Sequence, residues 1–155
     1  MKRLLVAAFV LLAGCIITVE AQPISTRDVK KATVTLYKVA EIPVAPLDQA
    51  PGAQYIQGYQ VLATHELTKT EIDSLKPVMT DSANYIFSMS KSCPFMAQYA
   101  MRIDGKAGIV DIIISRESCI KMIIKSDAEE NPRYYDLRKQ NKILPMVDKM
   151  MEMYE

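Results

Sequence analysis

Three short runs of alternating apolar residues lie close together in the second half of the chain. They are separated by two turn-like segments, 104–108 (DGKAG) and 116–118 (RES). An apolar side chain at every second position indicates a strand with one face in the core. Three such runs joined by short turns predict an antiparallel meander from 95 to 125 with one buried face. The alternating residues are Tyr99, Met101 and Ile103, then Val110, Ile112 and Ile114, then Ile120, Met122 and Ile124.

Two segments ahead of the meander are also predicted as strands. Residues 32–39 (ATVTLYKV) and 55–64 (YIQGYQVLAT) are rich in β-branched and aromatic residues, and Gly58 marks a bulge or a close approach. Residues 41–54 carry three prolines and a Pro-Gly pair, which predict a loop between the two strands. The sheet is therefore expected to have about five strands.

Helices are predicted where apolar residues recur at helical spacing. Thr68 and Glu71 match a capping box, and Pro77 is expected to bend or stop the helix that follows. A short helical stretch is expected over 81–87, and a terminal helix with a broad apolar stripe over 141–153. We therefore predict an α+β fold: a single domain over 32–154, whose one antiparallel sheet ends in the three-stranded meander and is covered by two or three helices.

The N-terminus has the layout of a bacterial secretory signal. Lys2 and Arg3 precede an uncharged apolar run over 4–13. This run is shorter than the roughly 20 residues that a helix needs to cross a bilayer. We therefore expect an exported protein whose apolar N-terminal run is not a permanent anchor helix.

Two cleavage sites compete in this segment. Residues 12–15 (LAGC) resemble a bacterial lipobox, in which Cys15 is acylated after removal of 1–14. Residues 19–21 (VEA) suit ordinary signal peptidase, which would remove 1–21. The protein is accordingly expected either free in the periplasm or as a lipoprotein attached to a bacterial membrane through Cys15.

Composition excludes several classes of function. Nineteen basic residues against 18 acidic ones give a formal charge of +1, which provides no electrostatic footprint for nucleic acid. One histidine and three cysteines without a CxxC pair offer little for a metal site. The chain contains no GxSxG, phosphate-loop or HExxH motif. We expect no catalytic residue, no cofactor and no bound metal.

Cys93 and Cys119 are the two cysteines that follow the signal segment. In the predicted meander both lie at one end of the sheet, about two strand spacings or roughly 9–10 Å apart. An oxidising compartment favours their pairing, so a structural disulfide is predicted if the chain before the first meander strand curls inward. The alternatives are two inert thiols, or a reactive cysteine in a redox protein or enzyme.

The second face of the meander carries charged residues. Arg102, Asp111 and Lys121 are the candidates for a partner-binding face. The alternative is that they are solvated charges that contribute little to stability, and we favour this interpretation.

Four stretches of the chain, taken in order, resemble a family of small exported bacterial proteins of unknown function. The stretches are 36–37 (LY), 58–62 (GYQVL), 93–95 (CPF) with 99–103 (YAMRI), and 110–114 (VDIII) with Cys119. The resemblance implies the order and topology of the elements and no activity. That family has a cysteine pair after the VD strand, where this chain has Ser115, Ser118 and the single Cys119.

Together these features predict an exported envelope protein that is a non-catalytic binding or inhibitor-type module. Its partner would be an envelope protein or a small ligand. One alternative is a thiol-dependent redox protein or enzyme that uses Cys93 or Cys119. Another is a structural envelope lipoprotein.

Overall fold

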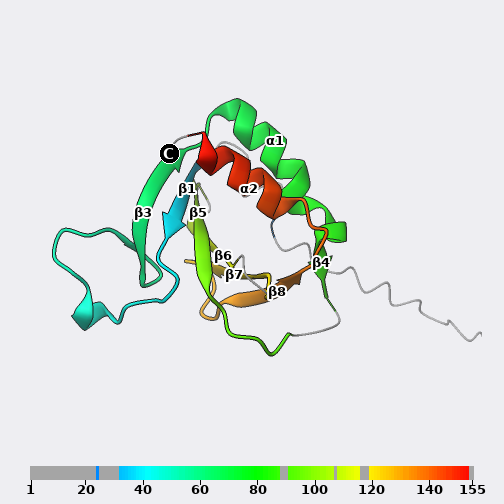
Figure 1. Ribbon diagram of the computed structural model, residues 1–155. Helices are drawn as coiled ribbons and strands as arrows, with labels where there is room; N and C mark the ends of the chain where they lie inside the picture. Colours follow the sequence, from blue (N-terminus) through cyan, green and yellow to red (C-terminus); the bar gives the residue numbers. More distant parts are fainter. Residues whose placement is uncertain (1–23, 25–31, 88–90, 107, 116–118, 154–155) are drawn as a thin grey trace, which may run out of the picture.

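The computed structural model describes residue 24 and residues 32–87, 91–106, 108–115 and 119–153. It has an α+β fold with one antiparallel sheet and two α-helices (Figure 1). The signal segment and Cys15 lie outside the described residues. The elements in chain order are β1 (Thr33–Val39), η1 (Pro46–Asp48), β2 (Tyr55–Ile56), β3 (Tyr59–Glu66), α1 (Lys69–Thr80), η2 (Ser82–Asn84), β4 (Tyr85–Ile86), β5 (Ala97–Gly105), β6 (Gly108–Ser115), β7 (Lys121–Ser126), β8 (Arg133–Leu137) and α2 (Ile143–Glu152).

The sheet has eight strands in the order β2-β3-β1-β5-β6-β7-β8-β4, with every neighbouring pair antiparallel. The predicted meander is confirmed as β5, β6 and β7, and its second turn at 116–118 lies outside the described residues. The expectation of about five strands is wrong. The additional strands are β2, β4 and β8, of which β2 and β4 have only two residues each.

The segment predicted as one strand over 55–64 is a hairpin. Gln57 and Gly58 have φ values of 50° and 87°, so the chain reverses there and separates β2 from β3. Two consecutive residues with positive φ are typical of the tight turns that match the twist of a hairpin. Gly58 is therefore a turn residue: the bulge in this segment lies at Leu62, and the predicted close approach is confirmed, because Gly58 lies against residues 43 and 44.

Helix α1 begins at the capping box that the sequence predicts. The Glu71 backbone N–H donates to the Thr68 hydroxyl, and the Glu71 carboxylate accepts from the Thr68 N–H. The helix continues past Pro77 to Thr80, so Pro77 does not stop it, and the alternative expectation of a bend stays a prediction. The helix expected over 81–87 is also absent, because the chain there forms the short η2 turn and then pairs with β8 as β4.

The two helices lie together over one face of the sheet (Figure 1). The apolar stripe of α2 packs onto the side chains that alternate in β5, β6 and β7, as predicted. Met101, Ile112 and Met122 from these three strands are at most 1% exposed. Burial of this many aliphatic side chains is the main stabilising contribution to the fold.

The central part of the second face of the sheet is buried as well, which corrects the expectation of one open face. Ile113 is only 1% exposed and belongs to a separate core cluster. The cluster contains Tyr37, Val39, Ile56, Tyr59, Ala97, Ala100 and Ile113, with Val61, Phe95 and Ile123 packed against it. The cover is provided by the β2–β3 hairpin and by residues 91–96, because Ile56, Tyr59 and Phe95 all come from these segments.

Candidate functional site

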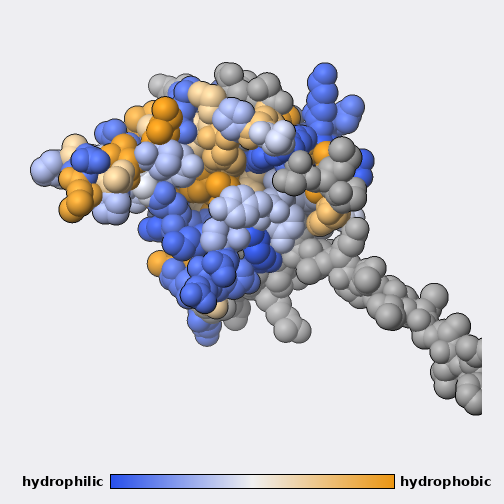
Figure 2. All heavy atoms as spheres, turned by 90° about the horizontal axis from the view of Figure 1, so that it is seen from below, coloured by the Kyte–Doolittle hydropathy of each residue, from blue (hydrophilic) through white to orange (hydrophobic). Residues whose placement is uncertain are grey.

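A loop over 41–54 joins β1 to β2 and projects from the body of the molecule (Figure 1). We call it the recognition loop. Leu47, in the η1 turn, has 99% of its side chain exposed, and Ile42 has 69%. Apolar side chains gather on this projection, at the left of the molecule (Figure 2). Apolar side chains that gather on an exposed surface point to a contact site, whereas a single exposed one does not, so the patch with Ile42 and Leu47 is a candidate contact for another molecule.

Hydrogen bonds hold the recognition loop although it lies outside the sheet. The Val44 N–H donates to Gly58 O at 2.8 Å, and the Val61 N–H donates to Gln54 O at 2.9 Å. The Tyr55 hydroxyl accepts from the Ala50 N–H at 2.9 Å. A loop that is already ordered loses little conformational entropy when it binds, so the apolar tip is presented in a preorganised form.

The hairpin turn under the loop leaves little room for a side chain at position 58. A Cβ atom on Gly58 would lie 3.2 Å from Val44 O and 3.3 Å from Pro43 Cβ. The positive φ of Gly58 independently favours glycine. The close approach of the hairpin to the loop therefore depends on this glycine.

An ion pair on the second face of the sheet holds the β2–β3 hairpin turn in place through Gln57. The Gln57 side-chain amide donates to Asp111 Oδ2 at 2.7 Å, and Arg102 Nε and Nη2 donate to Asp111 Oδ1 and Oδ2 at 2.8 and 2.9 Å. Asp111 is 2% exposed. Because the hydrogen bonds from Arg102 to Asp111 favour the charged guanidinium, they raise the pKa of Arg102 above its usual value. We call this set, Gln57, Asp111 and Arg102, the turn clamp.

The turn clamp also shows how strongly the sheet curls. Gln57 precedes β3, and Asp111 lies on β6, three strands away in the sheet order. A direct hydrogen bond between them requires the β2–β3 turn to fold back over the second face. This curl encloses the second core and places the recognition loop at the margin of the molecule.

A pocket of about 200 Å³ lies at the base of the recognition loop, where two β-bulges flank the end of β1. Val39 and Lys38 pair with Val61 and Ala63, which leaves Leu62 as an extra residue in β3. In β5, which lies on the other side of β1, Gln98 is the extra residue in the ladder with β6. Both extra residues line the pocket, and bulges commonly occur next to functional sites. The lining comprises Lys38, Val39, Ala40, Glu41, Leu62, Met96, Ala97 and Gln98.

The predicted partner face does not form one cluster. Arg102 and Asp111 pair with each other, as described above. Lys121 lies elsewhere: its ammonium group donates to Lys91 O and to Cys93 O. That the three residues form a face for a partner stays a prediction, and the structure gives Asp111 a role inside the fold.

Cys93 and Cys119 form a disulfide with a Cα–Cα distance of 5.8 Å. The predicted separation of two strand spacings is too long because the chain before β5 curls across β7 and β8. The Lys91 N–H donates to Asp136 of β8 at 2.7 Å, which holds this crossing segment in place. The disulfide fastens residues 91–96, which bring Phe95 to the second core and Met96 to the pocket.

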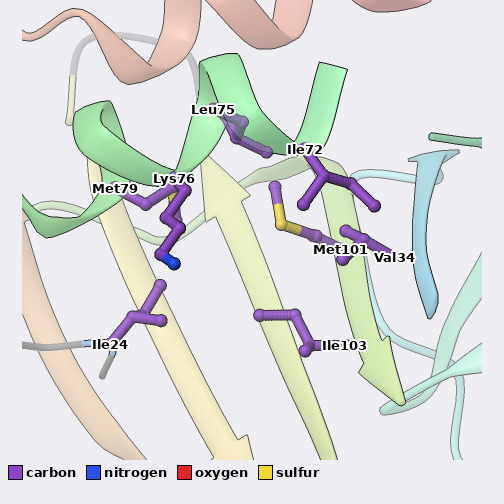
Figure 3. A pocket seen from close by; sticks show the side chains of 8 residues that line it. All are labelled: Ile24, Val34, Ile72, Leu75, Lys76, Met79, Met101 and Ile103. Atoms are coloured by element: carbon purple, nitrogen blue, oxygen red, sulfur yellow. The ribbon is translucent and has the colours of Figure 1, made fainter. Parts of the chain in front are cut away.

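A smaller apolar pocket lies between α1 and the sheet (Figure 3). It is lined by Ile24, Val34, Ile72, Leu75, Lys76, Met79, Met101 and Ile103. Ile24 is 3% exposed and the Lys76 side chain extends toward it, so the pocket is largely filled by the chain itself. We interpret it as imperfect packing in the main core.

The described part of the chain contains no group of three or more His, Cys, Asp or Glu residues able to hold a metal ion. Within the same residues, no helix has the length and apolar character needed to cross a membrane. Comparison with protein families, with curated proteins and with solved structures gives no match. The resemblance to small exported bacterial proteins therefore stays a prediction, and the candidate site rests on geometry alone.

Sequence reasoning missed the central residues of this site. It predicted the loop from its prolines, but no pattern singles out Leu47 as exposed or Gln57 as a partner of Asp111. The available signal is weaker: Leu47 follows Pro46 in a segment with three prolines, which is typical of a surface loop rather than of a core strand.

Proposed function

We propose that the protein is a non-catalytic binding module, of the inhibitor type, that uses the recognition loop to engage a partner protein of the bacterial cell envelope. The observation that carries this proposal is the almost complete exposure of Leu47 at the tip of a loop whose backbone is held by hydrogen bonds. A preordered loop with an apolar tip suits insertion into a preformed pocket on a second protein.

The charge of the recognition loop indicates the charge that we expect on the surface of the partner. Residues 41–54 contain Glu41 and Asp48 and no lysine or arginine. A complementary surface would offer an apolar socket for Leu47 and basic side chains around its rim. The two carboxylates also disfavour insertion of the loop into an anionic membrane surface, so a protein partner fits better than a bilayer.

We further propose export through the N-terminal signal, followed either by lipid attachment at Cys15 or by release after Ala21. The basic residues and the short apolar run support export. Replacing Cys15 by Ser should move a lipoprotein from the membrane fraction to the soluble fraction. Unchanged fractionation together with a mature N-terminus at Gln22 would identify the soluble form.

Site-specific photocrosslinking in the native envelope tests the proposed binding function. A photoreactive amino acid is placed at Leu47, and a matched control carries it at Met153, which is 60% exposed on the C-terminal helix end. The proposal predicts a discrete protein adduct from position 47 and none from position 153. Adducts to lipid alone, or the same adducts from both positions, would contradict it.

A further inference from the structure

Among the described residues, partners of the outer edge of β3 cover only part of its length. Strand β2 pairs with Tyr59 and Gln60 alone, and the Val61 N–H bonds to Gln54. From Leu62 to Glu66, no described strand lies beside the outer edge. Figure 1 shows β3 on one side of the sheet with the recognition loop beside its first residues.

The direction of the backbone groups follows from the register. The Leu67 N–H donates to Val34 O, and Leu36 lies opposite His65. In an antiparallel ladder such pairs alternate, so the N–H and C=O groups of His65 point to β1. Those of Thr64 and Glu66 point outward, away from the sheet.

This edge has only part of the usual protection against strand pairing. Proteins block edge strands with proline, with lysine or by making them very short. Residues 59–66 contain no proline, lysine or arginine. The opposite edge of the sheet is formed by the two-residue strand β4 and, beyond it, by residues 133–135 of β8, where Arg133 supplies a positive charge. Strand β3 keeps two weaker devices, the bulge at Leu62 and the charged side chain of Glu66, one at each end of the open stretch.

We propose that an extended segment of the partner pairs with β3 from Leu62 to Glu66 and adds a strand to the sheet. This inference rests on the proposed function, because the same partner would contact the recognition loop. Unpaired main-chain donors and acceptors supply the affinity in strand addition, and side chains supply the specificity. Leu62, 59% exposed, favours an apolar residue opposite it, and the exposed Glu66 favours a lysine or arginine. A basic strand also matches the acidic recognition loop.

The test uses a phage-displayed library of random peptides, selected on the folded mature protein. Amide hydrogen exchange is then measured with and without the selected peptides. Strand addition predicts that peptides protect the Thr64 and Glu66 amides, whereas His65 is already protected by β1 in the free protein. Failure to select any peptide, or selected peptides that leave both amides unprotected, would overturn the proposal.

A matched pair of variants provides a second readout. Thr64→Pro removes an outward N–H and spares the ladder to β1, since proline is tolerated on the solvent side of an edge strand. Thr64→Val keeps the N–H and the branched shape. Peptide affinity should fall about tenfold or more in Thr64→Pro and stay within about twofold in Thr64→Val. Equal peptide affinity in the two variants would overturn strand addition. If Thr64→Pro does not fold, the hydrogen-exchange measurement on the unmodified protein tests strand addition instead.

Two further outcomes separate this inference from the proposed function. Peptides whose binding depends on Leu47 and not on position 64 would overturn strand addition and leave the recognition loop as the binding site. Protection of Thr64 and Glu66 that rises with protein concentration in the absence of peptide would show that a second copy of the chain occupies the edge, and would also overturn it.

Discussion

The Gln57 side chain donates a 2.7 Å hydrogen bond to Asp111, a residue 54 positions later in the chain. Through this bond, an ion pair buried on the second face of the sheet controls the turn on which the recognition loop rests. Gln57 holds a positive φ that non-glycine residues seldom adopt, and its bond to Asp111 helps to maintain that conformation. The stability of the fold and the shape of the candidate site are therefore linked.

Asp111→Ala should destabilise the protein and loosen the turn. It leaves the Arg102 guanidinium and the Gln57 amide without their acceptor. Loss of one partner from a buried pair costs about 3–5 kcal/mol, and we expect the lower part of that range because the Arg102 side chain is 32% exposed. Denaturant unfolding measures the cost, with Lys125→Ala, an exposed residue opposite Asp111 in β7, as the control. Equal costs for the two variants would contradict the role of the turn clamp.

Ile112→Ala and Ile113→Ala should each cost about 2–5 kcal/mol, although their side chains lie on opposite faces of β6. The reason is that the two residues are 0% and 1% exposed, in two different cores. Leu62→Ala, at an exposed position, should change stability by less than about 0.5 kcal/mol. A small loss for Ile113→Ala alone would mean that the second face is open.

Much of the fold follows from the sequence because its signals are local. The alternation around Ile112 fixes the meander, and Thr68 with Glu71 fixes the start of α1. Strand β8 escapes prediction because its five residues, RYYDL, lack a clear alternation and follow a polar loop. The two-residue strands β2 and β4 are recognised as strands only because they pair with β3 and β8.

The candidate site is less predictable because it depends on contacts between distant segments. The prolines of 41–54 indicate a loop, but its position depends on the curl of the sheet that brings Gln57 to Asp111. The pocket likewise depends on two bulges, at Leu62 and Gln98, which appear only once the strands are in register. Sequence periodicity indicates neither the curl of the sheet nor the positions of the two bulges.

Peptide mapping by mass spectrometry without reduction should find Cys93 linked to Cys119. The closed segment spans 26 residues, for which the chain-entropy account gives roughly 3–4 kcal/mol of stabilisation. Thermal unfolding of a Cys93→Ser, Cys119→Ser double variant should show that loss. Two free thiols in the native protein, with one alkylated much faster than the other, would instead favour the thiol-dependent alternative.

Stability should fall in acid partly through Glu71. Burial alone would raise the pKa of this carboxyl, but hydrogen bonds from Thr68 and His65 outweigh it and lower the pKa below its ordinary value of 4.5. A lowered pKa in the folded state means that the stabilisation is complete above the unfolded value and is lost as pH falls through the folded value. The stability difference between the wild type and Glu71→Gln should therefore shrink between about pH 6 and pH 3. A difference that is constant over this interval would show that the charge of Glu71 does not contribute.

The affinity of Leu47→Asp for the protein captured by photocrosslinking at position 47 tests the central claim most directly. Because the Leu47 side chain is 99% exposed, the substitution should leave the free energy of unfolding unchanged within about 0.5 kcal/mol. If Leu47 is the apolar anchor of the interface, the affinity should fall by about thirtyfold or more, the loss of at least about 2 kcal/mol expected of a hot-spot residue. Met153→Asp, the matched control, should bind as the wild type does. Unchanged affinity of Leu47→Asp would contradict the account.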